Sequence, residues 1–422
     1  MTSPAPFRLG SVALPVYLPS LLFATGEGAV IPILPVSATR LGAPLALAGL
    51  IAGLLTVGQL IGDLPSGWIV ARVGERRAML GSAAAALVGL LLALVAPVPA
   101  VLALGVLIVG IATASFALAR QAFMTSFVPL AYRARALSLL GGMFRAGYFV
   151  GPFLAAAVIA LAGTTQAAFF LDAIACFASA VVLLALPDPA EALAARRRAA
   201  VAPRADRPQS DEVLAGGGAR PREGLFATVW RHRGVLARMG TNAALIGGLR
   251  ASRQVILPLV AVSLRMPESS IALVIGLAGL VDFALFFTSG QIMDRFGRLW
   301  SALPSMIGLG LGHLVLALTH DLPSAVAWFV AVAMFLSVAN GLGSGILMTF
   351  GADLAPRHDP APFLGAYRFT GDVGNAAAPL LISLLTAVSS VAVAAGAIGV
   401  LGLLGAGLAA RWVPRYIGRR AV

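Results

Sequence analysis

The chain consists of long apolar runs separated by short stretches that hold most of its charged residues. A helix rises about 1.5 Å per residue, so an apolar run of about 20 residues can cross the roughly 30 Å hydrocarbon layer of a membrane. Cutting the chain into such runs predicts twelve membrane-spanning helices, near Val12–Val36, Leu45–Val70, Met79–Val95, Ala100–Phe123, Ala136–Leu161, Ala167–Leu186, Val235–Val262, Ser270–Ile292, Ser301–Leu318, Ser324–Gly351, Phe363–Val388 and Val391–Trp412. We therefore expect an all-α integral membrane protein with twelve transmembrane helices.

The same pattern occurs twice along the chain, at an offset of 223 residues. The segment Gly67–Gly74 aligns with Gly290–Gly297, and without a gap Arg145 falls on Arg368. Internal repeats of this kind are typical of transporters built from two related halves around a central site. The repeat predicts two pseudo-symmetric six-helix halves, residues 1–186 and 235–422, and a flexible cytoplasmic linker rich in Arg, Ala, Pro and Gly over residues 187–234.

Composition supports a membrane protein and limits the remaining classes. Charged residues make up 11% of the chain, against about 25% in soluble domains. The net charge of +13 reflects 30 basic residues, all of them arginine. If the N-terminus lies in the cytoplasm, most of these arginines fall in cytoplasmic segments, whereas Arg40 and Arg265 lie on the external side. This bias follows the positive-inside rule. We expect a multi-pass protein of the plasma membrane, a bacterial inner membrane, with both termini cytoplasmic and no nucleic-acid partner.

Several kinds of chemistry are excluded by the residues present. A phosphate-binding P-loop needs a lysine, and the chain has none, so ATP-driven pumping is not expected. The four histidines have no partners at metal-ligand spacing, and we interpret His313 as a packed helix residue. The single cysteine, Cys176, lies inside the sixth predicted span, which excludes an internal disulfide. We expect no enzyme activity, no cofactor and no metal.

Charged residues within the predicted spans are the candidates for the transport pathway. A charge near the bilayer centre costs about 2.5 to 3.5 kcal/mol on insertion scales, so it needs a function or a partner. Glu27 lies in the first predicted helix, and its repeat equivalent is Arg250 in the seventh. We expect the two on opposite walls of one cavity, with Glu27 either paired with an arginine or serving as a proton or substrate site.

Further charges extend this candidate pathway. Arg145 and Arg368 occupy equivalent positions of the two halves, and Asp372 follows Arg368 by four residues, on the same helical face, where the two can form an ion pair. Asp282 and Arg253 have no obvious local partner and are better individual pathway candidates. Arg120, near the end of the fourth predicted helix, is expected to snorkel towards the interface.

These features resemble the major facilitator superfamily. Its cytoplasmic signature, Gly-x-x-x-Asp-Arg-x-Gly-Arg-Arg, is matched after the eighth predicted helix by Gly290, Asp294, Arg295, Gly297 and Arg298. After the second helix the matching residues are Gly67, Arg72, Gly74 and Arg76, while Ala71 replaces the aspartate. The resemblance implies that these loops are a latch on the cytoplasmic side, with Asp63 as a possible substitute for the missing acid.

The run from Gly147 to Pro152 in the fifth predicted helix, with Gly151 before the proline, looks like the motif of proton-driven antiporters in that superfamily. Glu27 matches by location the acidic residue of its multidrug exporters. The resemblance implies a transporter of the drug:proton antiporter group, a monomer that exports a small amphipathic organic compound in exchange for protons.

Other functions remain open at this stage. An uptake symporter for a small anionic metabolite is the alternative within transport, because four arginines would make a positively charged cavity. An intramembrane aspartyl protease using Asp282 and Asp372 is disfavoured, since Asp372 follows Phe369-Thr370-Gly371 rather than Gly-x-Gly. A sensor built on a transporter fold is disfavoured because no signalling domain is visible.

Overall fold

The computed structural model describes residues 16–127, 130–186, 230–356 and 360–417, and within these ranges twelve helices are long and apolar enough to cross a membrane. The predicted all-α fold of twelve membrane helices is confirmed. Residues 187–229 of the predicted linker at 187–234 lie outside the described residues, so the predicted division of the chain into two halves and a linker stays a prediction. Residues 12–15 of the first predicted span also lie outside them.

The first half contains six spans, the first of which is interrupted. Pro32 and Pro35 lie at the point of interruption, where a proline cannot donate the backbone hydrogen bond that a continuous helix needs. The elements of this half are α1 (Leu18–Val30), the short 3₁₀ helix η3 (Ile31–Ile33), α2 (Leu34–Arg40), α3 (Leu45–Val73), α4 (Glu75–Leu94), α5 (Pro99–Phe127), α6 (Leu130–Ala162) and α7 (Gln166–Ala185).

The second half follows the same order, but its break lies elsewhere. The tenth span of the chain, predicted as one helix over Ser324–Gly351, is divided at Gly343-Ser344-Gly345. Gly345 there has a φ of 81°, a backbone conformation that favours glycine. The elements are α10 (Arg233–Val235), η4 (Leu236–Gly240), α11 (Thr241–Ser263), α12 (Glu268–Phe296), α13 (Leu299–Thr319), α14 (Ala325–Leu342), α15 (Ile346–Leu354), α16 (Pro360–Val388) and α17 (Val391–Tyr416).

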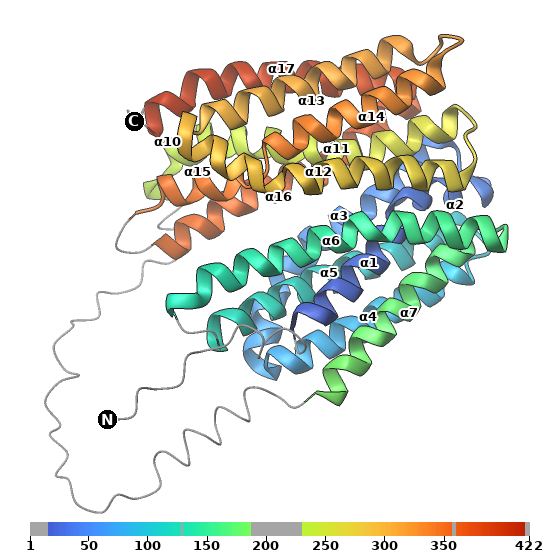
Figure 1. Ribbon diagram of the computed structural model, residues 1–422, viewed down its shortest axis with the longest axis horizontal. Helices are drawn as coiled ribbons and strands as arrows, with labels where there is room; N and C mark the ends of the chain where they lie inside the picture. Colours follow the sequence, from blue (N-terminus) through green and yellow to red (C-terminus); the bar gives the residue numbers. More distant parts are fainter. Residues whose placement is uncertain (1–15, 128–129, 187–229, 357–359, 418–422) are drawn as a thin grey trace, which may run out of the picture.

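Figure 1 shows the two groups of helices side by side, α1 to α7 in one and α10 to α17 in the other. The groups meet along equivalent pairs of helices, because α3 packs against α16 and α12 packs against α6. We call the end of the molecule at which α2 stops the outer end, following the arginine distribution, and the opposite end the inner end. At the outer end Ser383 Oγ of α16 donates a hydrogen bond to the Ala46 carbonyl of α3 over 2.8 Å.

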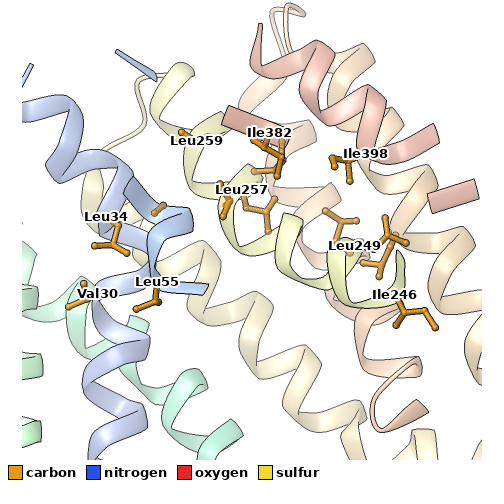
Figure 2. Packing of buried hydrophobic residues seen from close by; sticks show 14 of the residues in the cluster. Val30, Leu34, Leu55, Ile246, Leu249, Leu257, Leu259, Ile382 and Ile398 are labelled. Atoms are coloured by element: carbon orange, nitrogen blue, oxygen red, sulfur yellow. The ribbon is translucent and has the colours of Figure 1, made fainter. Parts of the chain in front are cut away.

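Buried apolar side chains fill the space between the helices. Figure 2 shows Val30, Leu34 and Leu55 of the first half, and beside them residues of α11, α16 and α17 including Leu257 and Ile382. Large apolar side chains also cover the outside of the molecule. On α7 the exposed face carries Phe170, Ile174, Phe177 and Leu184, while Asp172, Cys176 and Ser179 are buried. An exposed face of this kind suits a lipid environment rather than water.

Candidate functional site

A cavity of about 410 Å³ lies between the two halves, and both halves form its wall. Its polar lining residues are Thr56, Gln59, Arg145, Tyr148, Arg250, Arg253, Gln254, Asp282, Asn340 and Asn375. The lining also includes the aromatic side chains of Phe144, Phe149 and Phe283. A molecule bound here would contact both halves, which is the arrangement that alternating access around a central site requires.

The charges of the second half form one hydrogen-bonded cluster on the cavity wall. Arg253 Nη2 lies 3.3 Å from Asp282 Oδ2, and Arg253 Nη1 donates to Ser337 Oγ over 2.7 Å. The Asn340 amide nitrogen lies 2.8 Å from each oxygen of Asp282, and Asn340 Oδ1 accepts a hydrogen bond from Arg250 Nε over 3.0 Å. Arg253 and Asp282, which have no partner close to them in the sequence, therefore pair with each other between α11 and α12.

Arg145 extends from α6 to the second half. Its Nη1 donates to Ser344 Oγ over 3.0 Å, and its guanidinium carbon lies 4.0 Å from the centre of the Phe286 ring. Arg145 and Arg250, which come from different halves, both line the cavity. Arg145, Arg250, Arg253 and Asp282 therefore gather at one cavity, with three guanidinium groups to one carboxylate.

Glu27 is buried inside the first half, with 2% of its surface exposed, and is not part of the cavity wall. Its Oε1 accepts a hydrogen bond from Gln59 Nε2 over 3.2 Å, and both Gln59 and Tyr148, which also faces the carboxyl, line the cavity. The expectation that Glu27 and Arg250 share opposite walls is thus wrong for Glu27, because Gln59 and Tyr148 cover it. The carboxyl is connected to the cavity through these two side chains.

Two charged residues near Glu27 are not identified as site residues by sequence reasoning. Asp172 of α7 is 2% exposed, and its Oδ1 lies 3.5 Å from Cys176 Sγ, one helical turn further on. Arg120 of α5 does not snorkel as predicted: its guanidinium carbon lies 3.4 Å from the centre of the Phe144 ring, and Nε and Nη1 are buried with no hydrogen-bond partner among the described residues. The available signal for Asp172 was an acid in the middle of an apolar span.

The remaining predicted pathway residues lie outside the cavity lining. Arg368 Nε is 3.6 Å from Asp372 Oδ2 on α16, so the expected ion pair forms, and Asn375 Nδ2 donates to Asp372 Oδ1 over 3.3 Å. The Arg368 side chain is 58% exposed. The charges of this pair also act on Asp63 of α3, which makes no hydrogen bond or ion pair within the described part of the chain.

The two signature loops close the inner ends of α3 and α12 in the same way. Gly74 and Gly297 both end their helices with positive φ, 84° and 93°, a conformation that explains the glycine of each signature. Arg76 donates to the Leu183 carbonyl at the end of α7 over 2.6 Å. Each loop is thereby held to other helices of its own half, as the contacts of Arg298 show for the second loop.

Arg298 of the second signature loop contacts two carboxylates. Its Nε lies 2.9 Å from Asp353 Oδ2 of α15, and its Nη1 lies 3.9 Å from Asp294 Oδ1. The hydrogen bond with Asp353 raises the pKa of the Arg298 guanidinium above its ordinary value. The other two signature arginines contact neighbouring rings, Arg72 that of Trp68 and Arg295 that of Phe296.

The glycines of the helix-five motif bring α6 against α1. A side chain at Gly151 would collide with the α1 backbone at Thr25, Gly28 and Ala29, and one at Gly147 would collide with Ala24 and Thr25. Gly290 of the second signature loop, by contrast, has open space beside it. The close approach of α6 therefore occurs at the turn of α1 that carries Glu27.

Two six-helix groups around a charged central cavity define a secondary active transporter. The model of the Major Facilitator Superfamily matches residues 16–379 and 240–420, and the chain belongs to that superfamily, whose members are transporters rather than enzymes. A search of curated proteins gave no match.

Solved structures share the fold at low identity. A POT family transporter in complex with a thioalcohol conjugated peptide has 13% identity and a TM-score of 0.75, covering 96% of each chain. A D-xylose-proton symporter has 15% identity and a TM-score of 0.71 over 98% of this chain and 100% of the other. The partially occluded, inward-open xylose transporter XylE from E. coli has 15% identity and a TM-score of 0.70 over 97% of this chain and 100% of the other.

Proposed function

We propose that this protein is a proton-coupled transporter that exports a small amphipathic organic compound by alternating access. The observation that carries the proposal is the position of Glu27, a buried carboxyl hydrogen-bonded to Gln59 on the cavity wall. A carboxyl removed from bulk water yet connected to the substrate cavity can exchange a proton in step with the occupation of that cavity.

The direction of transport rests on helix α6. Gly147, Gly151 and Pro152 resemble the antiporter motif, and the two glycines pack against the turn of α1 that carries Glu27. The motif thus holds α6 against the part of α1 that carries the proposed proton-binding residue. This position supports a transporter that exchanges a proton for its substrate. Export of an anion in exchange for a proton would move both charges in the direction favoured by an inside-negative potential, worth about 2.3 kcal/mol per charge per 100 mV.

An uptake symporter for a small anionic metabolite is the second candidate. The excess of guanidinium groups in the cavity favours it, since a bound anion would balance these positive charges. One structural neighbour is a D-xylose-proton symporter by name, so proton-coupled uptake is compatible with this fold.

We place the protein in the plasma membrane, a bacterial inner membrane, as a monomer with both termini in the cytoplasm. The arginine distribution of the chain supports this orientation, and the exposed apolar face of α7 supports direct contact with lipid. The linker at 187–234 would then connect the two halves on the cytoplasmic side.

A two-stage experiment tests the function. A growth screen of an exporter-deficient bacterial host, with and without the protein, against a panel of toxic compounds would supply a substrate. Inverted vesicles with an acidic lumen would then report its movement. Accumulation of substrate in the lumen with loss of the pH gradient is expected for export. Release of preloaded substrate together with protons would favour the symporter, and transport that a protonophore leaves unchanged would contradict proton coupling.

A further inference from the structure

We infer that the cavity binds the anionic head group of its substrate, a carboxylate or a similar oxyanion, between Arg145 of α6 and Arg250 of α11. The inference rests on the proposed function only in taking the molecule bound in this cavity as the one transported. It concerns the chemical class of the substrate and is independent of the direction of transport.

The arrangement around Asp282 leaves Arg250 without a carboxylate partner. Arg253 forms the ion pair with Asp282, and Asn340 donates to both oxygens of the same carboxylate. Within the described residues Arg250 donates a hydrogen bond only to the side-chain oxygen of Asn340, which is neutral. Asn340 therefore separates Arg250 from the one carboxylate that lines the described cavity wall.

Arg145 is likewise bonded only to a neutral oxygen. Within the described residues its one hydrogen bond goes to the Ser344 hydroxyl, and its guanidinium group lies over the Phe286 ring. A guanidinium has five N–H donors. No side-chain nitrogen of Arg145 or Arg250 is both buried and without a hydrogen-bond partner in the described part of the chain. The remaining N–H donors of the two residues are therefore open to the cavity that both residues line.

The two guanidinium groups also repel one another. Arg145 and Arg250 carry like charges and line the same cavity from opposite halves of the protein. Like charges near one another in a protein interior raise the energy of the empty site, because the effective dielectric constant there is well below that of water. An anion placed between them would remove the repulsion and accept charge-assisted hydrogen bonds from both.

The rest of the cavity wall suits an apolar body. The Phe149 and Phe283 rings stack across the two halves with centroids 5.9 Å apart, and Phe144 and Tyr148 form a tilted pair 5.5 Å apart. All four residues line the cavity. A substrate with an anionic head and a flat or aliphatic body would contact arginine and aromatic surfaces together, so the assigned class is an amphipathic organic anion.

Equilibrium binding to the purified full-length protein tests this assignment. The probes are three molecules that share one apolar body: 3-phenylpropionate, its neutral amide 3-phenylpropionamide, and the cation 3-phenylpropylamine. We expect the carboxylate to bind at least about tenfold more tightly than the other two, because only the carboxylate can accept charge-assisted hydrogen bonds from both guanidinium groups. Arg145→Gln and Arg250→Gln should each weaken carboxylate binding about tenfold or more and leave amide binding unchanged.

Control variants separate the head-group site from general effects on charge or folding. Arg265→Gln removes a positive charge from the exposed outer loop and should bind the carboxylate as the unmodified protein does. Arg250→Lys keeps the charge and should recover part of the affinity. Equal binding of the three probes, tighter binding of the amine, no binding of the carboxylate, or unchanged affinity in both glutamine variants would overturn the assignment. None of these results depends on proton coupling, which the vesicle experiment tests separately.

Discussion

Arg40 at the end of α2 and Glu268 at the start of α12 form an ion pair that joins the outer ends of the two halves. Arg40 also donates from Nη1 to Thr165 Oγ1 over 3.5 Å. The repeat offset places Ser263 and Leu45 at the equivalent positions, neither of which carries a charge. This contact between the two halves therefore has no charged counterpart at the equivalent positions of the repeat.

Arg40→Gln should shift the protein towards its outward-open state. The pair is partly exposed, with 45% of the Arg40 side chain accessible, so its loss is worth about 0.2 to 1 kcal/mol and changes the population ratio by up to about fivefold. Labelling of Ser383→Cys by an impermeant maleimide, in a Cys176→Ala background, measures this shift because Ser383 lies in the outer contact. The charge-reversed double variant, Arg40→Glu with Glu268→Arg, should restore slow labelling; fast labelling there would argue against an ionic contact.

Gly151→Ala should destabilise the protein by about 1 to 3 kcal/mol, because the added methyl group collides with the α1 backbone. Gly141→Ala on the same helix is the matched control, since open space surrounds that position. It should be neutral or slightly stabilising, as alanine favours a helix over glycine by up to about 1 kcal/mol. Thermal unfolding in detergent measures both. Equal stability of the two variants would show that α1 and α6 do not depend on this contact.

Asp282→Asn should be more damaging to stability than Arg253→Gln. Loss of Asp282 leaves three guanidinium groups without a carboxylate, whereas loss of Arg253 leaves Asp282 bonded to Asn340 beside Arg250. We expect a cost of up to about 3 kcal/mol for the first and less for the second. The double variant should fall between them in thermal unfolding. A larger cost for Arg253→Gln would mean that Asp282 is not the group that balances the cluster.

Glu27→Gln should abolish the proton uptake or release that accompanies substrate binding while preserving insertion and folding, because the amide keeps the shape of a protonated carboxyl and can neither gain nor lose a proton. Glu27→Asp should retain part of the activity. A pH-sensitive dye records proton uptake or release by the protein in detergent when substrate is added. Asp321→Asn, whose side chain is 91% exposed, is the control for loss of a carboxyl. A proton signal from Glu27→Gln equal to that of the unmodified protein would move the role to Asp172 or Asp282.

Reporter fusions test the orientation assigned from the arginines. Fusions after Arg77, near Gly217 and at the C-terminus should report a cytoplasmic location, and fusions near Arg40 and Arg265 an external one. Two sites separated by an odd number of spans lie on opposite sides of the membrane, and two sites separated by an even number lie on the same side. A single site on the wrong side would therefore contradict the predicted number of spans between it and its neighbours.

Hydrophobic pattern was enough to place the spans, since crossing a membrane requires length and apolarity before anything else. The second span was predicted over Leu45–Val70 and α3 runs over Leu45–Val73. The pattern could not locate the break between α14 and α15, because the residues there stay apolar and small. That break depends on one backbone conformation, the positive φ of Gly345.

The site was only partly predictable for a related reason. Sequence reasoning identified the charged residues that a membrane helix carries at a cost, and four of them, Arg145, Arg250, Arg253 and Asp282, line the cavity. Which of them pair depends on how each helix is rotated about its own axis. Glu27 shows the limit most clearly: its position along α1 follows from the sequence, but its cover by Gln59 from α3 is a tertiary contact.

The excess of arginine in the cavity has a consequence for the resting protein. A carrier that opens a water-accessible chamber inside the membrane risks becoming a leak for metal cations. Fixed guanidinium charges in a narrow passage exclude such ions electrostatically. Arg145 and Arg250, which lack a carboxylate partner, would thus keep the substrate-free carrier impermeable to cations between transport cycles.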